Sequence, residues 1–431
     1  MRDPPSASPV LPQEICDEII DFAKDCSETM KLCTRVCRNW LPRARANLFY
    51  DFTFPPENQQ EQLNDCNPDT IVEEIMLSID NMNASPLTPS LFSLVRRLTI
   101  NVEWMAWLLQ VVPALSFQVS FKNLAHIRLC RPDNFSRLNP VSMEAKSLSG
   151  FLEQQQLSRL ESFILDSDLF FPLMTDFFEM YHRVVASRAN RLHTLAIHGV
   201  YNTVKFDDVD SDMARHIVKL PKMVHPPRLR ILKLDAFQLR WAEHILSPLH
   251  LFDTSSLHTL IIVGCSPSDL KDSESLRCIF GQCGSLITSL LLEITYITQI
   301  IPVLPQHQAF GHLTNLDHFA LKLSSNDYFP NLLRNLLMAV LPCFQNLQRL
   351  TIIIVFIDER LHWVTQYFNE DLDDFFVSLT RTSNPRLAAI NVCMPAGTKR
   401  LETSISSNLL KTKESGLLKI CVGCEVDPFM I

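Results

Sequence analysis

Apolar residues recur along this chain in a fixed triplet: one apolar residue, two spacers, a second apolar residue, one spacer and a third. The first positions of ten copies are Val95, Leu124, Leu160, Leu192, Leu229, Leu257, Ile287, Leu316, Leu347 and Leu387. The shortest interval, from Leu229 to Leu257, is 28 residues, and the longest, from Leu347 to Leu387, is 40. A weaker eleventh copy begins at Leu417. Repetition at such a period is typical of proteins built from stacked units.

Each triplet predicts a short strand, and the segments between triplets have helical character, for example 170–188, 207–220, 269–283 and 331–344. Alternating strands and helices favour an α/β fold whose strands pair in parallel. We therefore expect residues 95–422 to form an irregular solenoid, followed by a tail at 423–431. A polar stretch at 57–69 and a helix at 70–82 indicate a linker and leading helix over residues 55–94.

The amino-terminal residues 11–54 predict three short helices. The first follows Pro12 and places Ile15, Ile19, Phe22 and Ala23 on one helical face. A break at 25–28, with Ser27 as a candidate N-cap, precedes a second helix that is expected to run to about Trp40. Pro42 then begins a third helix that ends near Leu48 and Phe49.

The second helix carries two apolar stripes, which are Leu32, Val36 and Trp40, and Met30, Cys33, Cys37 and Leu41. A short helix with two apolar faces needs two partners. One stripe can close the small helical unit, and we expect the Leu32 stripe to remain as a patch for a second protein.

Residues 11–54 resemble the F-box family, and more closely the F-box-like proteins abundant in fungi. The matching segments are Leu11-Pro12-Gln13-Glu14-Ile15, Val36-Cys37-Arg38-Asn39-Trp40, Ala44-Arg45 and Leu48-Phe49. The resemblance implies docking onto the Skp adaptor of a cullin-RING ubiquitin ligase. The residues expected to bind the adaptor, at its surface or just behind it, are Leu11, Pro12, Ile15, Ile19, Leu32, Val36 and Trp40. The alternative is that these residues make a small helical cap.

The units of residues 95–422 resemble leucine-rich repeats of the long, helix-containing kind, which F-box proteins often carry. The Asn or Cys usually found three residues after the last anchor of a repeat is mostly missing, and Cys265, after Ile262, is the clearest match. Phe237 occupies that place after Leu234. The loops must then satisfy their backbone groups in another way, so we expect uneven curvature.

Strand alternation places the residue between the last two anchors of each triplet on the opposite face of the sheet, which we expect to be exposed to solvent. In the middle of the chain this face reads as an apolar stripe of Ile164, Ile261 and Leu291 with Lys233 between them, flanked by Asp235 and Glu293. An apolar centre with a polar rim is typical of protein recognition, so these six residues are the candidate substrate-binding set. The alternative is that helices or the carboxy-terminal tail cover the stripe.

Charge and composition exclude several classes of function. The 431 residues carry a net charge of -8, and no run of Lys and Arg is present, so we expect no nucleic-acid partner. The longest uncharged run, 104–121, contains Pro113 and polar residues, which favours a buried helix and loop over a membrane span. The thirteen cysteines lack a framework spacing, and no targeting segment precedes residue 11, so we expect a cytoplasmic or nuclear protein.

Catalytic and metal motifs are missing from the sequence. With nine Gly, the chain has no GxGxxG, GxxxxGK or GxSxG pattern, and it has no HExxH. The candidate groups that remain are Cys421 with Cys424, His244 with His250, and the acids Asp207, Asp208, Asp210, Asp212, Asp371, Asp373 and Asp374. We interpret these as solvated or structural, and we expect no metal or cofactor.

The sequence therefore predicts a non-catalytic substrate-recognition subunit of a Skp/cullin/F-box ubiquitin ligase, which captures an unidentified protein substrate through its solenoid. Two alternatives stay open: a repeat scaffold with no ligase role, and an undetected enzyme in the α/β body.

Overall fold

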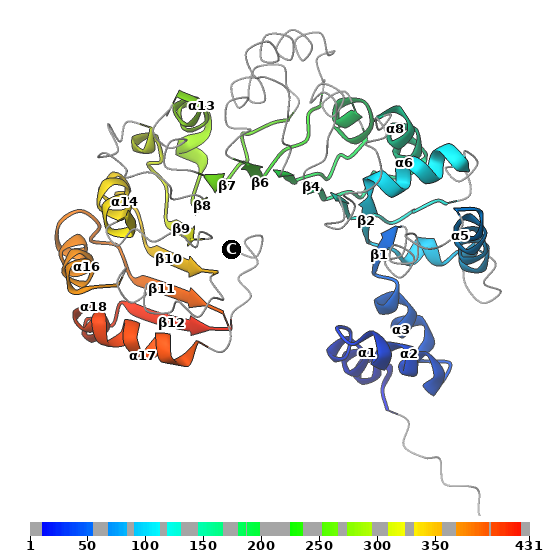
Figure 1. The fold of residues 1–431 in the computed structure, drawn as a ribbon, viewed down its shortest axis with the longest axis horizontal. Helices are drawn as coiled ribbons and strands as arrows, with labels where there is room; N and C mark the ends of the chain where they lie inside the picture. The colour runs from blue at the N-terminus through cyan, green and yellow to red at the C-terminus, as the bar shows by residue number, and fades with distance from the viewer. Residues whose placement is uncertain are drawn as a thin grey trace, which may run out of the picture. The chain divides into compact units, whose positions relative to one another are not determined.

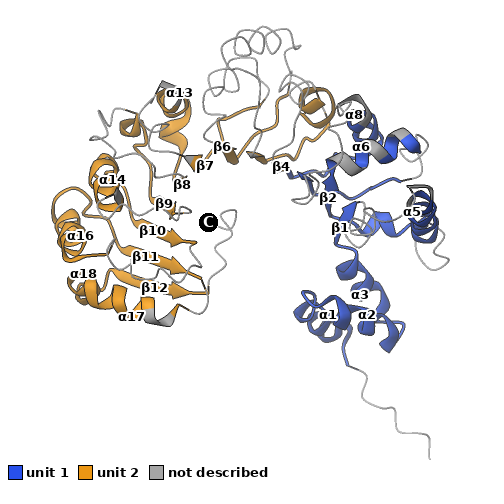
Figure 2. Cartoon of the chain, in the orientation of Figure 1, with its two compact units in different colours: residues 1–163 blue, residues 164–431 orange. Residues whose placement is uncertain are grey.

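The protein is described by a computed structural model that covers residues 11–54, 68–83, 90–112, 119–130, 145–166, 180–186, 188–198, 225–235, 252–265, 274–294, 309–323, 332–355, 368–395 and 398–423. Two compact units make up the chain, residues 1–163 and residues 164–431 (Figure 2). The boundaries at 54/55, 94/95 and 422/423 stay predictions, and residues 424–431 of the predicted tail lie outside the described residues.

The fold is mixed α/β, with a parallel sheet of twelve strands whose order follows the sequence from β1 to β12 (Figure 1). The strands are β1 (Asp51–Phe54), β2 (Arg97–Asn101), β3 (His126–Cys130), β4 (Ser162–Asp166), β5 (Thr194–His198), β6 (Ile231–Asp235), β7 (Thr259–Cys265), β8 (Ser289–Ile294), β9 (His318–Leu323), β10 (Arg349–Ile354), β11 (Ala389–Met394) and β12 (Leu418–Val422).

The helices within the described residues are α1 (Gln13–Phe22), α2 (Ser27–Val36), α3 (Leu41–Leu48), α5 (Pro68–Asn83), α6 (Val102–Val111), α8 (Ala145–Gln154), α13 (Glu274–Cys283), α14 (Leu332–Val340), α16 (Glu370–Thr382), α17 (Lys399–Asn408) and α18 (Leu410–Glu414). Short helical turns are η1 (Leu91–Leu94), η2 (Tyr181–Ala186), η4 (Gly284–Leu286), η5 (Phe310–His312) and η6 (Leu341–Cys343).

A strand occupies each of the eleven triplet positions, which confirms the predicted strands and their parallel pairing. The sequence prediction missed β1, which pairs with β2 in the register Phe52↔Leu98 and Phe54↔Ile100. Helices were also found where 70–82, 269–283 and 331–344 predict them. The predicted helix at 207–220 lies outside the described residues, and only 180–186 and 188 of the segment 170–188 are described.

The core lies on the anchor face of the sheet, where the last two residues of each triplet point. In the second unit, register pairs such as Leu350↔Ile390 and Phe319↔Leu350 place anchor beside anchor. Phe344 extends this core, with its ring 5.3 Å from that of Phe319 and 6.1 Å from that of Phe310. In Figure 1, helices α14, α16, α17 and α18 follow one side of strands β9 to β12. The apolar period thus fixes both the strands and the face that they bury.

Asparagines that directly precede the first anchor of a triplet form hydrogen bonds between successive loops. They take the role of the Asn or Cys that is mostly missing three residues after the last anchor. The side-chain amides of Asn123, Asn315 and Asn346 each donate to a carbonyl one segment earlier, on Ser93, Ser285 and Thr314, at 2.6, 2.7 and 2.7 Å. We call these three contacts the asparagine rungs. The next segment adds an arginine in two cases: Arg159 donates to Asn123 at 3.0 Å, and Arg386 donates to Asn346 at 2.7 Å. Loop carbonyls are therefore satisfied between neighbouring segments.

Candidate protein-binding surfaces

The first three helices enclose a small apolar core of their own. Ile20, Met30, Cys33 and Ala44 are buried in it, and Trp40 packs against them. Helices α1 and α2 both contact α3. This arrangement is a compact helical unit whose core uses one side of each helix.

A polar contact joins α1 to α3. Arg43 donates through two guanidinium nitrogens to the carboxylate of Asp21, with Nε 2.7 Å from Oδ1, and Asn47 donates to the same Oδ1 at 2.8 Å. The hydrogen bond from Arg43 lowers the pKa of Asp21 below its usual range, and the bond from Asn47 adds to this. This paired contact links α1 to α3.

The second helix is shorter than predicted. It ends at Val36, because Cys37 adopts an extended backbone with φ -161°, and Trp40 becomes the residue before α3. Its N-cap is Cys26, so Ser27 is the first helical residue. Trp40 is consequently turned toward the core and is half-buried, which differs from its predicted place at an open surface.

Five of the seven residues predicted to face the adaptor leave large apolar side chains exposed. They are Leu11, Ile15, Ile19, Leu32 and Val36, and Leu32 and Val36 keep 61% and 59% of their surface. Pro12 is also exposed and precedes the first residue of α1. Such side chains are seldom left uncovered on so small a unit, so these helices carry a candidate protein-binding surface.

Phe22 is a further candidate residue on α1 that the prediction left out of the adaptor set. It is 94% exposed and lies seven residues after Ile15 and three after Ile19, on the same helical face. The buried residues of this helix are Cys16 and Ile20. Sequence spacing showed the Ile15 face, but it could not show that Cys16 and Ile20 take the inner side.

The candidate substrate-binding set lies on the opposite face of the sheet from the anchors. Strand register brings Lys233, Ile261 and Leu291 side by side in β6, β7 and β8. The expectation that Ile261 and Leu291 face solvent is wrong, because their side chains are 0% and 3% exposed. Both belong to a buried apolar cluster that crosses β7 to β11 and also contains Val263, Ala320, Ile353 and Cys393. We call this set the opposite-face cluster.

The remaining members of the candidate set are not open either. Ile164 and Lys233 are half-buried, and Asp235 is buried beside Gly264, where an added Cβ would lie 3.2 Å from Asp235 Oδ2. Gly264 has φ +71°, and the β7 to β8 register shifts around it, so a glycine is required there. Glu293 forms an ion pair with Lys322 at 3.0 Å.

A hydrogen-bonded row of polar side chains crosses the same face. Ser289 Oγ lies 3.5 Å from Nδ1 of His318, Nε2 of His318 lies 3.0 Å from Thr351 Oγ1, and Asn391 donates to that hydroxyl at 3.4 Å. Burial, assisted by the positive charge of Arg349, lowers the pKa of His318 from 6.5 to about 4. His318 is thus held neutral, and its contacts to Ser289 and Thr351 give it a structural role in the sheet.

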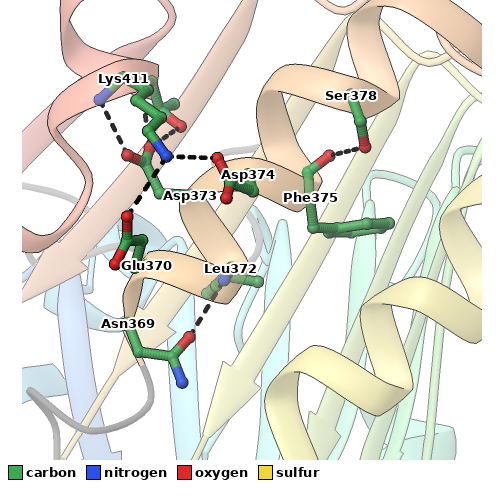
Figure 3. A network of polar contacts seen from close by, with 9 residues as sticks. Asn369, Glu370, Leu372, Asp373, Asp374, Phe375, Ser378 and Lys411 are labelled. Carbon is green, nitrogen blue, oxygen red and sulfur yellow. Dashed lines mark hydrogen bonds and ion pairs between the residues drawn. The ribbon is translucent and has the colours of Figure 1, made fainter.

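The acids near the start of α16 have structural partners (Figure 3). Asp373 is buried and accepts from the backbone N–H groups of Lys411 and Thr412, both at 2.8 Å, and from the Thr412 hydroxyl at 2.6 Å. Asp374 accepts from Lys411 Nζ at 2.6 Å, and Asp371 pairs with Arg334 at 2.8 Å. These contacts connect α16 to α18 and α14.

Other candidate chemistry falls largely outside the described residues. This applies to Asp207, Asp208, Asp210, Asp212, His244, His250 and Cys424. Within the part of the chain that the structure describes, no three His, Cys, Asp or Glu side chains are grouped to hold a metal ion. Among the same residues, no helix has both the length and the apolar character needed to span a membrane.

Comparison of the chain with protein-family models and with curated protein sequences found no significant match to either.

Proposed function

We propose that this protein is a substrate-recognition subunit of a Skp/cullin/F-box ubiquitin ligase. In this role the three amino-terminal helices hold the Skp adaptor, and the sheet-containing body captures a protein that other subunits modify. The chain itself performs no bond-making step and acts by bringing substrate and ligase together. The cytoplasm or the nucleus is the proposed location.

One observation carries the proposal: a compact three-helix unit leaves its Leu32 and Val36 side chains exposed while its Met30 and Cys33 side chains fill the core. Both pairs come from the same ten-residue helix. An apolar pair that the fold does not use is typical of a binding surface. The F-box resemblance names the partner, which is the Skp adaptor.

The substrate-binding surface needs a different assignment from the one that the sequence favours. Ile261 and Leu291 are buried, so they are not proposed as contact residues in this state of the chain. The proposal keeps substrate capture on the predicted solenoid, residues 95–422, without naming its contacts.

The test is co-expression of the full chain with a Skp adaptor, followed by gel filtration and a direct affinity measurement. We expect a stable complex with the wild type. The double variant Leu32→Asp with Val36→Asp should weaken the complex on the order of a hundredfold or more. It removes two central apolar contacts and would bury two charges in the interface.

A matched control is the double variant Leu77→Asp with Val111→Asp, which changes two exposed apolar residues outside the three helices. It should bind like the wild type. A folded wild-type chain that forms no adaptor complex contradicts the ligase role and favours the repeat scaffold. Equal loss in both double variants contradicts the assignment of the surface to α2.

A further inference from the structure

The last two strands of the sheet carry cysteines at directly paired positions. Cys393 of β11 and Cys421 of β12 are register partners in the parallel ladder, one position after the pair Val392↔Ile420. Both are thiols in this structure. Their side chains share a face, since Cys393 belongs to the opposite-face cluster and Cys421 packs against that cluster.

The spacing of neighbouring strands suits a bond between these sulfurs. Adjacent strands lie about 4.8 Å apart, inside the Cα separation of roughly 4.4–6.8 Å that disulfides span. Parallel strands also keep their Cβ atoms about as far apart as the strands, whereas a relaxed disulfide holds them at roughly 3.8 Å. Closing the bond must pull β12 slightly toward β11.

The position of β12 allows that movement. Within the described residues β12 ends the strand order, so it is held by β11 on one side only. Just after β12, the N–H of Gly423 donates to the Met394 carbonyl at 2.9 Å, and Gly423 has φ +74°. Cys421 is half-buried and Cys393 is buried, which makes Cys421 the thiol that an oxidant reaches first.

We propose that Cys393 and Cys421 form a reversible cross-strand disulfide that locks the last strand of the sheet in response to a peroxide. The Cys421 thiol loses its proton, the thiolate attacks one peroxide oxygen and the O–O bond breaks. The released hydroxide takes up that proton, so a sulfenic acid and one water result. Cys393 then attacks the Cys421 sulfur, the S–S bond forms, the S–O bond breaks, and a second water leaves. The two thiols lose two electrons, and the peroxide gains them.

The strained geometry predicts a bond that thiols reduce readily, because disulfides away from their preferred geometry are more easily reduced. Closing it would enclose α17 and α18 in a loop between β11 and β12. The oxidised protein would therefore hold its carboxy-terminal segment more tightly than the reduced protein does.

Peptide mapping of the full chain tests the proposal. Hydrogen peroxide is added to the reduced protein, remaining thiols are alkylated, and the monomer band of a non-reducing gel is digested with trypsin. Cleavage after Arg386, Lys399 and Lys419 puts Cys393 and Cys421 on different peptides, whereas Cys421 and Cys424 share one. We expect the two peptides to be joined and to separate after dithiothreitol.

Three variants test which thiols form the cross-link. Cys424→Ser should keep the cross-link, because it removes only the competing thiol, and Cys343→Ser should keep it as a control for loss of an unrelated thiol. Cys421→Ser should abolish it. A product confined to Cys421 and Cys424, or a Cys393 that stays fully alkylated in both the wild type and Cys424→Ser, would overturn the proposal.

Discussion

At the scale of single residues, His318 couples the stability of the sheet to pH. Its two ring nitrogens lie near Ser289 and Thr351, and the ring has a pKa of about 4 in the folded chain against 6.5 when exposed. The unfolded chain therefore takes up a proton at a higher pH than the folded chain does. The contribution of His318 to the stability of the folded chain is fully present above pH 6.5 and declines as the pH falls toward 4.

We expect the free energy of unfolding to decrease between pH 6.5 and 4 by up to about 3 kcal/mol through this residue alone. Urea unfolding at several pH values checks this, with His318→Gln as the comparison. The difference between the two proteins should change across that interval and level off below it. Parallel stability curves for wild type and variant would show that His318 does not produce the effect.

Residue identities predict which positions are anchors, because Leu, Ile and Phe recur at the triplet spacing. They do not predict whether a second apolar face is covered. Ile15 and Ile19 on α1 are exposed, whereas Ile261 and Leu291 in the sheet are buried, although all four are large apolar residues. Periodicity reports which residues share a face, and burial depends on what packs there.

At the scale of elements, Asp373 holds α18 against α16. The Asp373 carboxylate accepts hydrogen bonds from the N–H groups of Lys411 and Thr412 and from the Thr412 hydroxyl, so it supplies acceptors to the first turn of α18. Thr412 is itself buried. A helix as short as α18 depends on such a contact, because few of its N–H groups find partners inside the helix.

Replacing Asp373 by Ala should therefore destabilise the protein by about 3 kcal/mol, since buried donors lose their acceptor. Asp374→Ala is the matched control: the neighbouring carboxylate is exposed and pairs with Lys411 at the surface, so little change is expected. Chemical denaturation of both variants measures the difference. Equal stability of the two variants would contradict the assigned role of Asp373.

Strand β1 shows why an element can escape sequence analysis. Asp51–Phe54 has four residues and no complete triplet, and it follows directly after three helices. Its stability comes from pairing with β2 and from Phe52, whose ring lies 6.0 Å from Phe92 and 6.2 Å from Phe121. These partners are distant in sequence, so no local sequence pattern predicts the strand.

At the scale of the whole molecule, each strand pairs with its neighbours in sequence, and the strand order ends at β12. The side chains of Leu418, Ile420 and Val422 are half-buried, whereas the paired anchors of β9 and β10 are fully buried. Protection should therefore decrease toward the last strand.

Hydrogen exchange followed by mass spectrometry checks this expectation. Amides of β9 and β10 should exchange at least on the order of tenfold more slowly than those of β12, since an edge strand opens without breaking the rest of the sheet. Peroxide treatment gives a second comparison, because a Cys393–Cys421 bond should slow exchange in β12. Equal protection of β9 and β12 in the reduced chain would contradict the edge position.

The parallel sheet and the sequence order of its strands were predictable, because the triplets repeat at a nearly regular spacing. The division into residues 1–163 and 164–431 was not, since no composition change marks it. The asparagine rungs also escaped prediction. Asn123, Asn315 and Asn346 each precede an anchor leucine, and this shared position is the signal that could have revealed them.

The same rungs have a mechanical consequence. Each one joins a loop to the loop one segment earlier, and each strand is hydrogen-bonded to adjacent segments. A force applied at the carboxyl end of the second unit would therefore load one ladder at a time, and the β9–β10 and β8–β9 ladders would each be reinforced by a rung. The chain should lengthen in a series of small steps of similar size, one for each strand pair that opens. It should shorten through the same steps when the force is released.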